Sequence, residues 1–346
     1  MPILNPTRPA HSRPLQRTIA AAIATASLVM LCGCPQKEEA PATTADAQPD
    51  EAAVAVAVAT AEAVAPAAPP ASPAPPVPRP TASATLKRAE LMALVFPDSQ
   101  GPGASPRQPD TVSLPERANE GKTVPGSEAD QQAQVSPREV VRLDDTHAVM
   151  LTETVPLDDR GEPMNGHVNG AWLGAYFFEQ SAEGWKLASR SDAVDYLGFM
   201  GNLGTTKVER IAPQRFALTI AHGSCWQGYC GQWLSVYGLE AGKVRVLARG
   251  IALSATNEGA DESCEKAPRP GKPEEPPRGA CFDVNGTPSF TLGTDEAPGE
   301  MRIAFKGEKT SGTKNRRVLT IDSTLVYAWR NGAYVLTEGR NPVPSF

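Results

Sequence analysis

The first 138 residues of the chain are poor in aromatic side chains. The sequence of 346 residues has 20 aromatics, and 19 of them lie after residue 138, with Phe96 as the exception. A segment without large apolar side chains cannot bury enough surface to offset the entropy that it loses on folding. We therefore expect any sizeable core in roughly the last 208 residues. This excludes a large multidomain enzyme and a polytopic membrane protein.

Acidic residues are absent from the amino terminus. Residues 1–17 carry three arginines and no acid, and the 14 residues Thr18–Leu31 carry no charge at all. A helix of that length is too short to cross a bilayer core of about 30 Å, for which about 20 residues are needed. A basic start followed by a short apolar stretch is typical of a secretory signal.

The uncharged stretch ends in Leu31-Cys32-Gly33-Cys34. This sequence resembles the lipobox of bacterial lipoproteins, in which signal peptidase II cuts ahead of an obligatory Cys that carries diacylglycerol and an acylated amine. The resemblance implies a lipoprotein signal peptide over residues 1–33, with Leu31 and Gly33 as recognition positions and Cys34 as the lipidated residue. Cys32 stands where Ala or Ser is usual. The alternative is an ordinary signal peptide without a lipid.

The resemblance also implies a location. In such lipoproteins an Asp directly after the Cys retains the protein in the inner membrane, and here that position is Pro35. The implied location is therefore the outer membrane of a Gram-negative bacterium, lipid-anchored on its periplasmic face. Several acyl chains give stable anchoring, at about 0.8 kcal/mol per buried CH₂.

The mature chain is acidic. Removing residues 1–33 leaves 30 basic and 39 acidic residues, a net charge of −9. An acidic chain is a poor partner for nucleic acid or anionic phospholipids. We therefore expect contact with the lipid bilayer through acylated Cys34, and no nucleic-acid partner.

A tether follows the lipidated position. Between Pro35 and Pro80, 27 of 46 residues are Ala or Pro. Proline removes backbone donors, and the side chains of both residues offer little to pack. We expect residues 34–83 to form a disordered spacer, whose part from Pro35 to Pro80 reaches about 140 Å as extended polyproline II and nearer 40 Å as a coil. A binding role for the tract is the alternative.

A short helix is predicted over residues 84–96, with Ser83 placed to cap it and Pro97 to stop it. We expect its apolar face to dock on the folded domain, and a partner-binding helix is the alternative; the face carries Leu91, Leu94 and Val95. Residues 97–138 return to Pro, Gly, Ser and charge. They are expected to be an irregular or disordered linker.

From residue 139 onward, short apolar runs are separated by turn residues. The clearest pair flanks Asn331-Gly332, the strongest short-range hairpin signal, because both residues tolerate positive φ. A two-residue loop sets Trp329 opposite Tyr334 and Tyr327 opposite Leu336, and we expect both pairs in the core.

Similar hairpins recur near residues 140–190, 207–250 and 300–338, which indicates a degenerate internal repeat. Three four-stranded units are too few for a propeller, and two prolines near the carboxyl end disfavour the closing strand of an outer-membrane barrel. We therefore predict an all-β domain over residues 139–346, built of antiparallel hairpins as a sandwich or a curved sheet.

Four cysteines remain besides Cys34. An even number in an exported domain indicates disulfides, with three possible connectivities. We favour Cys225–Cys230, which brackets a predicted turn, and Cys264–Cys281, which encloses a tract rich in Pro and charge. Closing a loop of the second kind stabilises by about 3 kcal/mol in the chain-entropy model. A redox pair is disfavoured because no Cys-x-x-Cys is present. A zinc site is disfavoured because the expected compartment is oxidising.

Chemistry-bearing residues are few. The mature chain has three histidines, His147, His167 and His222. His147 falls in a predicted polar turn, and His222-Gly223-Ser224 places a hydroxyl near an imidazole without a Gly-x-Ser-x-Gly elbow. The loop 158–167 combines acids with one imidazole but departs from calcium-loop spacing. We expect an ordinary acidic loop, no metal site and no cofactor.

The first disulfide brackets Trp226-Gln227-Gly228-Tyr229. Two aromatics on a cross-linked turn lose little entropy on binding, which makes Trp226, Gln227 and Tyr229 a candidate binding tip. The alternative is that Trp226 folds inward and fills the core. Exposure of the indole decides between them.

Taken together, the sequence predicts a non-catalytic module that binds or scaffolds an envelope protein or glycan. The alternative is an envelope hydrolase with an active site near His147, His167 or His222. An open pocket where two histidines converge with a carboxylate would favour the enzyme.

Overall fold

The computed structural model describes residues 80–97, 109–117, 123–260, 264, 280–294, 297–311 and 317–345. All of them belong to one compact unit that begins at Pro73. The predictions for the signal peptide, for Leu31, Gly33 and Cys34, and for nearly all of the tether lie outside the described residues. So does the Pro-rich tract between Cys264 and Cys281.

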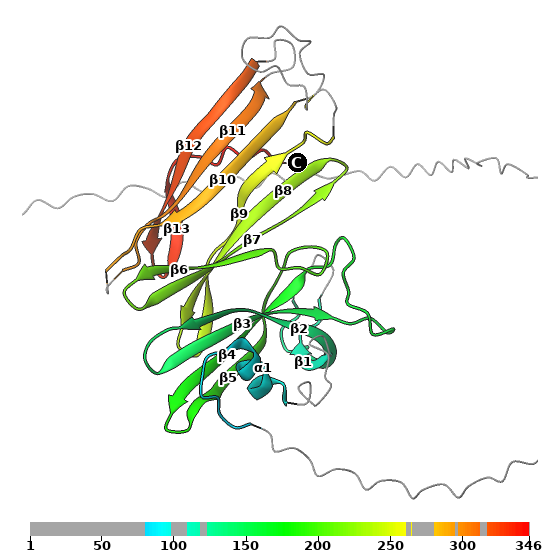
Figure 1. Ribbon diagram of the computed structural model, residues 1–346. Coiled ribbons are helices and arrows are strands. Elements are labelled where there is room, and N and C mark those ends of the chain that lie inside the picture. Colours follow the sequence, from blue (N-terminus) through cyan, green and yellow to red (C-terminus); the bar gives the residue numbers. More distant parts are fainter. Residues whose placement is uncertain are drawn as a thin grey trace, which may run out of the picture. The chain divides into compact units, whose positions relative to one another are not determined.

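The described part of the chain is mostly β, as predicted, with one helix and thirteen strands in two antiparallel sheets (Figure 1). The helix is α1 (Arg88–Val95). Sheet 1 has the order β1-β2-β3-β4-β5, with bounds Asp110–Leu114, Ala129–Arg142, His147–Pro156, Ala171–Ser181 and Gly184–Leu197. Sheet 2 runs from β6 to β13, with bounds Thr205–Ala212, Arg215–Trp226, Tyr229–Glu240, Lys243–Thr256, Phe282–Phe290, Met301–Ser311, Arg317–Arg330 and Ala333–Glu338.

Sheet 1 curls around α1. Its edge strands β1 and β5 approach each other, and side chains of β5 bond to the backbone of β1: the Ser113 N–H donates to Asp192 Oδ2 (2.9 Å), and Arg190 donates to the Thr111 carbonyl (3.0 Å). The apolar face of the helix packs inside this curl against all five strands; it consists of Leu91, Met92, Val95 and Phe96. The helix is thus docked on the domain, as expected.

Strands β3 and β4 are buried on both faces. Alternate residues of a strand point to opposite faces, so Met150 packs toward α1 while Val149 packs toward sheet 2. The face of β3 and β4 that carries Val149 packs against sheet 2, so the two sheets share one core. Sheet 2 contributes Leu218, Ile220, Tyr237 and Leu239 to this core. Burial on both faces explains why β4 reads as a nearly continuous apolar run.

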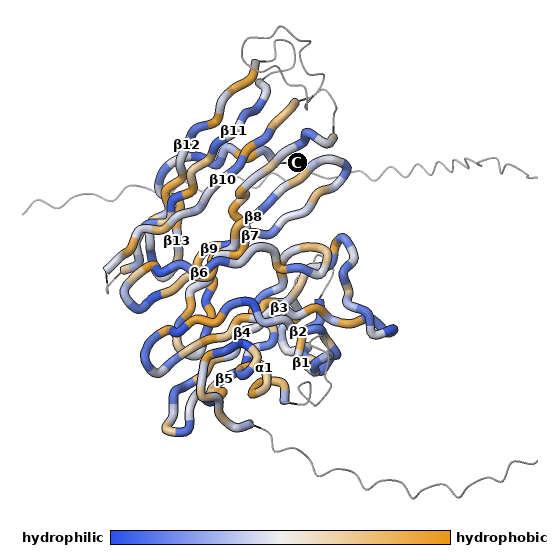
Figure 2. The backbone as a smooth tube through the Cα atoms, in the orientation of Figure 1, coloured by the Kyte–Doolittle hydropathy of each residue, from blue (hydrophilic) through white to orange (hydrophobic). Residues whose placement is uncertain are grey.

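Sheet 2 has a further core of its own, centred on Val236, Ile303, Phe305 and Leu325. Along β11 and β12 hydrophobic and hydrophilic residues alternate (Figure 2), as expected for strands with one covered face. The second and third predicted hairpin groups therefore form one sheet, because β9 pairs with β10.

The hairpin at Asn331-Gly332 has the predicted register, with Trp329 opposite Tyr334 and Tyr327 opposite Leu336. Asn331 and Gly332 both have positive φ, at 50° and 85°. One expectation was wrong: Leu336 is exposed, because β13 is an edge strand with a β-bulge beside this pair. Both predicted disulfides, Cys225–Cys230 and Cys264–Cys281, are formed.

The linker prediction for residues 97–138 was wrong where the structure describes them, since β1 and much of β2 lie there. Val112 and Leu114 are buried against α1, and this non-local contact supplies the apolar surface that the segment itself lacks. The β domain therefore begins before residue 139. The helix also starts later than predicted, at Arg88, and its N-cap Lys87 makes no side-chain cap bond.

Ser83 has a different role from the predicted cap. Its backbone exchanges two hydrogen bonds with Trp185 of β5, at 2.9 and 2.7 Å. Its hydroxyl donates to Glu90 (2.6 Å). Within the described residues, no helix has both the length and the apolar character to span a membrane.

Candidate functional site

The tip of the β7–β8 hairpin presents an aromatic side chain to solvent. Cys225 and Cys230 lie directly opposite each other, and so do Trp226 and Tyr229. Gln227 and Gly228 form the two-residue turn with φ of 49° and 84°, the conformation that fits the twist of a tight hairpin. The Trp226 side chain is 63% exposed. The alternative that Trp226 fills the core is therefore wrong.

The loop between β3 and β4 supports this tip. The imidazole of His167 lies 5.0 Å from the indole of Trp226, centroid to centroid, with the two planes 51° apart. Its Nε2 is 3.2 Å from Ser224 Oγ. Ser224 therefore has an imidazole partner, but the partner is His167 and not the neighbouring His222.

The loop between β5 and β6 contacts both the β3–β4 loop and strand β7. The Gly201 N–H donates to the Asn169 carbonyl (2.8 Å). A Cβ at Gly201 would lie 3.2 Å from Asn165 Cα, and one at Gly204 would lie 2.9 Å from His222 Cα. Glycine thus permits the close approach of this loop to the β3–β4 loop and to β7.

These three loops expose several large side chains together. We use the name loop-end surface for Met164, His167, Val168, Met200, Trp226, Gln227 and Tyr229. Met164, Val168, Met200 and Tyr229 are exposed in addition to Trp226, and Val168 is 76% exposed. Exposed apolar side chains gathered in this way mark an interaction site more often than scattered ones do.

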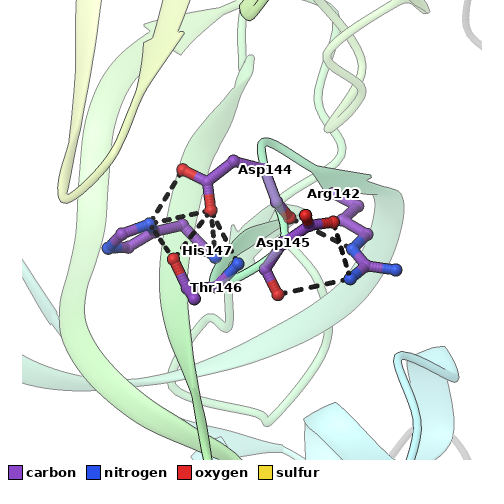
Figure 3. Close-up of polar contacts among 5 residues, drawn as sticks. All are labelled: Arg142, Asp144, Asp145, Thr146 and His147. Carbon is purple, nitrogen blue, oxygen red and sulfur yellow. Dashed lines mark hydrogen bonds and ion pairs between the residues drawn. The ribbon is translucent and has the colours of Figure 1, made fainter.

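His147 lies elsewhere, in the turn between β2 and β3 (Figure 3). Its Nδ1 is 2.9–3.0 Å from the two carboxylate oxygens of Asp144. Asp144 also accepts the backbone N–H groups of Thr146 (2.7 Å) and His147 (2.8 Å). These bonds, the Thr146 N–H above all, hold the pKa of Asp144 well below its usual value, at about 2. The polar turn predicted here is present.

A small cavity of about 270 Å³ opens beside this turn. His147, Glu179 and Ser189 line it together with the β8–β9 turn. The Ser189 hydroxyl is buried and has no hydrogen-bond partner among the described residues. An imidazole held by a carboxylate and a buried hydroxyl thus line one cavity, although no hydrogen bond joins His147 to Ser189.

His222 is neither solvated nor paired. Within the described part of the chain, both of its ring nitrogens are buried without a hydrogen-bond partner, and the ring stacks on Trp233 with centroids 6.4 Å apart. Burial lowers the pKa of His222, and nearby Asp195 opposes the shift. The three histidines therefore have three different surroundings.

The acidic residues of the loop 158–167 form a hydrogen-bonded turn. The Asp158 carboxylate accepts the backbone N–H groups of Arg160 (2.9 Å) and Glu162 (3.0 Å) and pairs with the Arg160 guanidinium. The Glu162 N–H contributes most to lowering the pKa of Asp158. Nowhere in the described ranges do three His, Cys, Asp or Glu side chains come together as a metal site would require.

A cleft of about 590 Å³ lies at the seam between β1 and β5. Its central group, Asp192, accepts hydrogen bonds from Tyr176 (2.8 Å), Arg190 (2.7 Å) and the Ser113 N–H (2.9 Å). Because these groups satisfy one another's hydrogen bonds, their role here is to close the curled sheet between β1 and β5.

Sequence reasoning found Trp226, Gln227 and Tyr229 but missed Met164, Val168 and Met200. A signal was present, since each of these three is a large apolar residue in a predicted loop that has glycines nearby. Ser189 carried no such signal, because only the pairing of β4 with β5 places it near His147. Comparison of the chain with protein-family models, curated proteins and solved structures gives no match.

Proposed function

We propose that the protein is a non-catalytic binding or scaffolding module, lipid-anchored to the outer membrane through Cys34, with its β domain in the periplasm. The loop-end surface is its contact with an envelope component. The observation that carries this proposal is the exposed indole of Trp226, held in place by the disulfide behind it and by His167 beside it.

A rigid aromatic tip is well suited to binding. A side chain that is already fixed loses little entropy when a partner covers it, and Trp is among the residues that most often dominate binding energy. The resemblance of residues 31–34 to a lipobox supports anchoring, and the Ala/Pro-rich composition of the tract that follows supports a spacer between the bilayer and the domain. Two disulfides accord with an oxidising compartment.

Anchoring is tested on Cys34. Mass spectrometry of the protein from membranes is expected to find acyl chains on Cys34, and the Cys34→Ser variant is expected in the soluble fraction. An unmodified Cys34 thiol, or a Cys34→Ser variant that still fractionates with membranes, would contradict the lipid anchor. The binding surface would then be tested independently by the footprinting experiment below.

Binding is tested by hydroxyl-radical footprinting in intact cells and on the purified protein. We expect oxidation of Met164, Met200 and Trp226 to be reduced several-fold in cells, because a bound component covers them. Leu292, which is also 63% exposed but belongs to the loop after β10, serves as the internal control. Equal oxidation of the three residues in both samples would contradict the proposal.

The hydrolase remains a second candidate, favoured by the cavity that His147 and Ser189 share. A fluorophosphonate probe labels a serine activated by such a base. Labelling that is lost in Ser189→Ala but kept in Ser224→Ala would support an enzyme. Absence of labelling in the wild-type protein would count against a serine hydrolase.

A further inference from the structure

We infer that the component bound by the loop-end surface is an uncharged glycan, with a sugar ring stacked on Trp226. The inference rests on the proposed function, because it names the chemical class of the partner for the same surface.

The first argument is the absence of charge. Residues 163–178, 198–204 and 216–239 contain no Asp, Glu, Lys or Arg, although 21% of the whole chain is charged. The loop-end surface lies within these three segments. Phosphate, acidic peptides and anionic headgroups are recognised mainly by Arg and Lys, which these segments do not offer. A neutral partner fits them best.

The second argument is the kind of polar group that is present. Asn165 and Gln227 are exposed, and the hydroxyl and imidazole of Ser224 and His167 lie beside the indole. An amide, a hydroxyl and a neutral imidazole each both donate and accept hydrogen bonds. Sugar hydroxyls also do both, so they match these groups without needing a fixed charge.

The third argument is the exposed indole. Trp combines a broad apolar ring with a polar N–H at its edge. A sugar ring has the complementary form, with C–H groups on one face and hydroxyls around its rim. Because His167 packs on Trp226 and the disulfide closes the hairpin, the indole is already held in position before the ligand binds. Protein interfaces, by contrast, are enriched in Arg as well as aromatics, and the three uncharged segments contain no Arg.

The test uses the purified mature chain carrying Cys34→Ser, so that no detergent is required. The probes are uncharged hexasaccharides of β-linked N-acetylglucosamine, of β-linked or α-linked glucose, of galactose and of mannose. A sulfated hexasaccharide is the charged comparison, and binding is followed by isothermal titration calorimetry. At least one is expected to bind with a Kd between about 10 µM and 1 mM, a range typical of a small solvent-exposed site.

Variants assign the binding to the surface. Trp226→Ala is expected to weaken binding about tenfold or more, and Trp226→Phe by less, because it keeps an aromatic ring. Leu292→Ala, a change at a similarly exposed position on another loop, is the matched control and is expected to bind like the parent. Circular dichroism confirms that each variant is folded.

Three outcomes would overturn the inference. They are no binding of any hexasaccharide, binding that Trp226→Ala leaves unchanged, and binding only of a sulfated oligosaccharide. If these occur while Met164, Met200 and Trp226 are still protected in cells, the glycan is wrong but the binding surface stands. If that protection is absent as well, the proposed function itself fails.

Discussion

His222 lies in β7, where both nitrogens of its imidazole are shielded from solvent. Both ring nitrogens lack a hydrogen-bond partner among the described residues, and burial lowers the pKa of the ring. In the unfolded chain the ring has its usual pKa near 6.5. As the pH falls below that value, the unfolded state binds a proton that the folded state resists, so stability is lost.

We predict that the wild-type protein loses more stability between pH 7.5 and pH 5.5 than His222→Phe does. The expected difference is about 0.5 kcal/mol, reduced because the ring is only partly shielded from solvent. Denaturant midpoints at the two pH values measure it. An equal loss in both proteins would mean that His222 does not contribute to the acid sensitivity.

At the scale of the single turn, glycine is required at the tip of β7–β8. A Cβ at Gly228 would lie 2.1 Å from the carbonyl carbon of Gly259, at a φ of 84°. Gly242, in the β8–β9 turn, has a similar φ of 78° with nothing within 4 Å of its Cβ position. Both glycines have a positive φ that disfavours a side chain, but only at Gly228 would a Cβ also collide with another part of the backbone.

We therefore predict that Gly242→Ala costs about 1 kcal/mol, the penalty for a left-handed residue with a side chain. Gly228→Ala is expected to cost about 2 kcal/mol more, because the backbone around residue 259 must move. Thermal or urea unfolding of the two variants gives the comparison. Equal losses of stability in the two variants would show that the backbone around Gly259 can move at no energetic cost.

At the scale of the element, the helix α1 has only eight residues. A helix this short is not stable by itself in water, so its packing inside sheet 1 maintains it. Leu91 is fully buried there, whereas Leu94 is only half-buried.

Leu91→Ala is expected to destabilise the protein by about 3 kcal/mol, as large-to-small changes in a closed core do. Leu94→Ala is expected to cost less than half of that. Urea denaturation measures both. A small effect of Leu91→Ala would indicate that the helix leaves the sheet without disturbing it, as the partner-binding interpretation of this segment requires.

At the scale of the whole domain, the two sheets share a core that includes Phe177 of sheet 1 and Tyr237 of sheet 2. We predict that they unfold together. Phe177→Ala is expected to lower hydrogen-exchange protection in β8 and in β4 by similar amounts, about 3 kcal/mol. A loss of hydrogen-exchange protection confined to sheet 1 would show that the two sheets are separate folding units.

The sequence was informative where structure depends on neighbouring residues. The Asn331-Gly332 hairpin and the Cys225–Cys230 tip were predictable, because turn residues and spacing determine both. The strand β1 was not, since Val112 and Leu114 are buried only by α1 and β2. Likewise, Met200 and Trp226 belong to one surface only because Gly201 and His167 bring three loops together.

The central claim is that the loop-end surface faces a bound component in the cell. It is tested most directly by photo-crosslinking in intact cells, with a benzophenone side chain placed at Gln227 or, as a control, at Leu319 of β12, which is also exposed. Benzophenone inserts into C–H bonds of both sugars and proteins. The account predicts a discrete adduct from position 227 and none from position 319; no adduct at 227, or equal adducts at both positions, would contradict it.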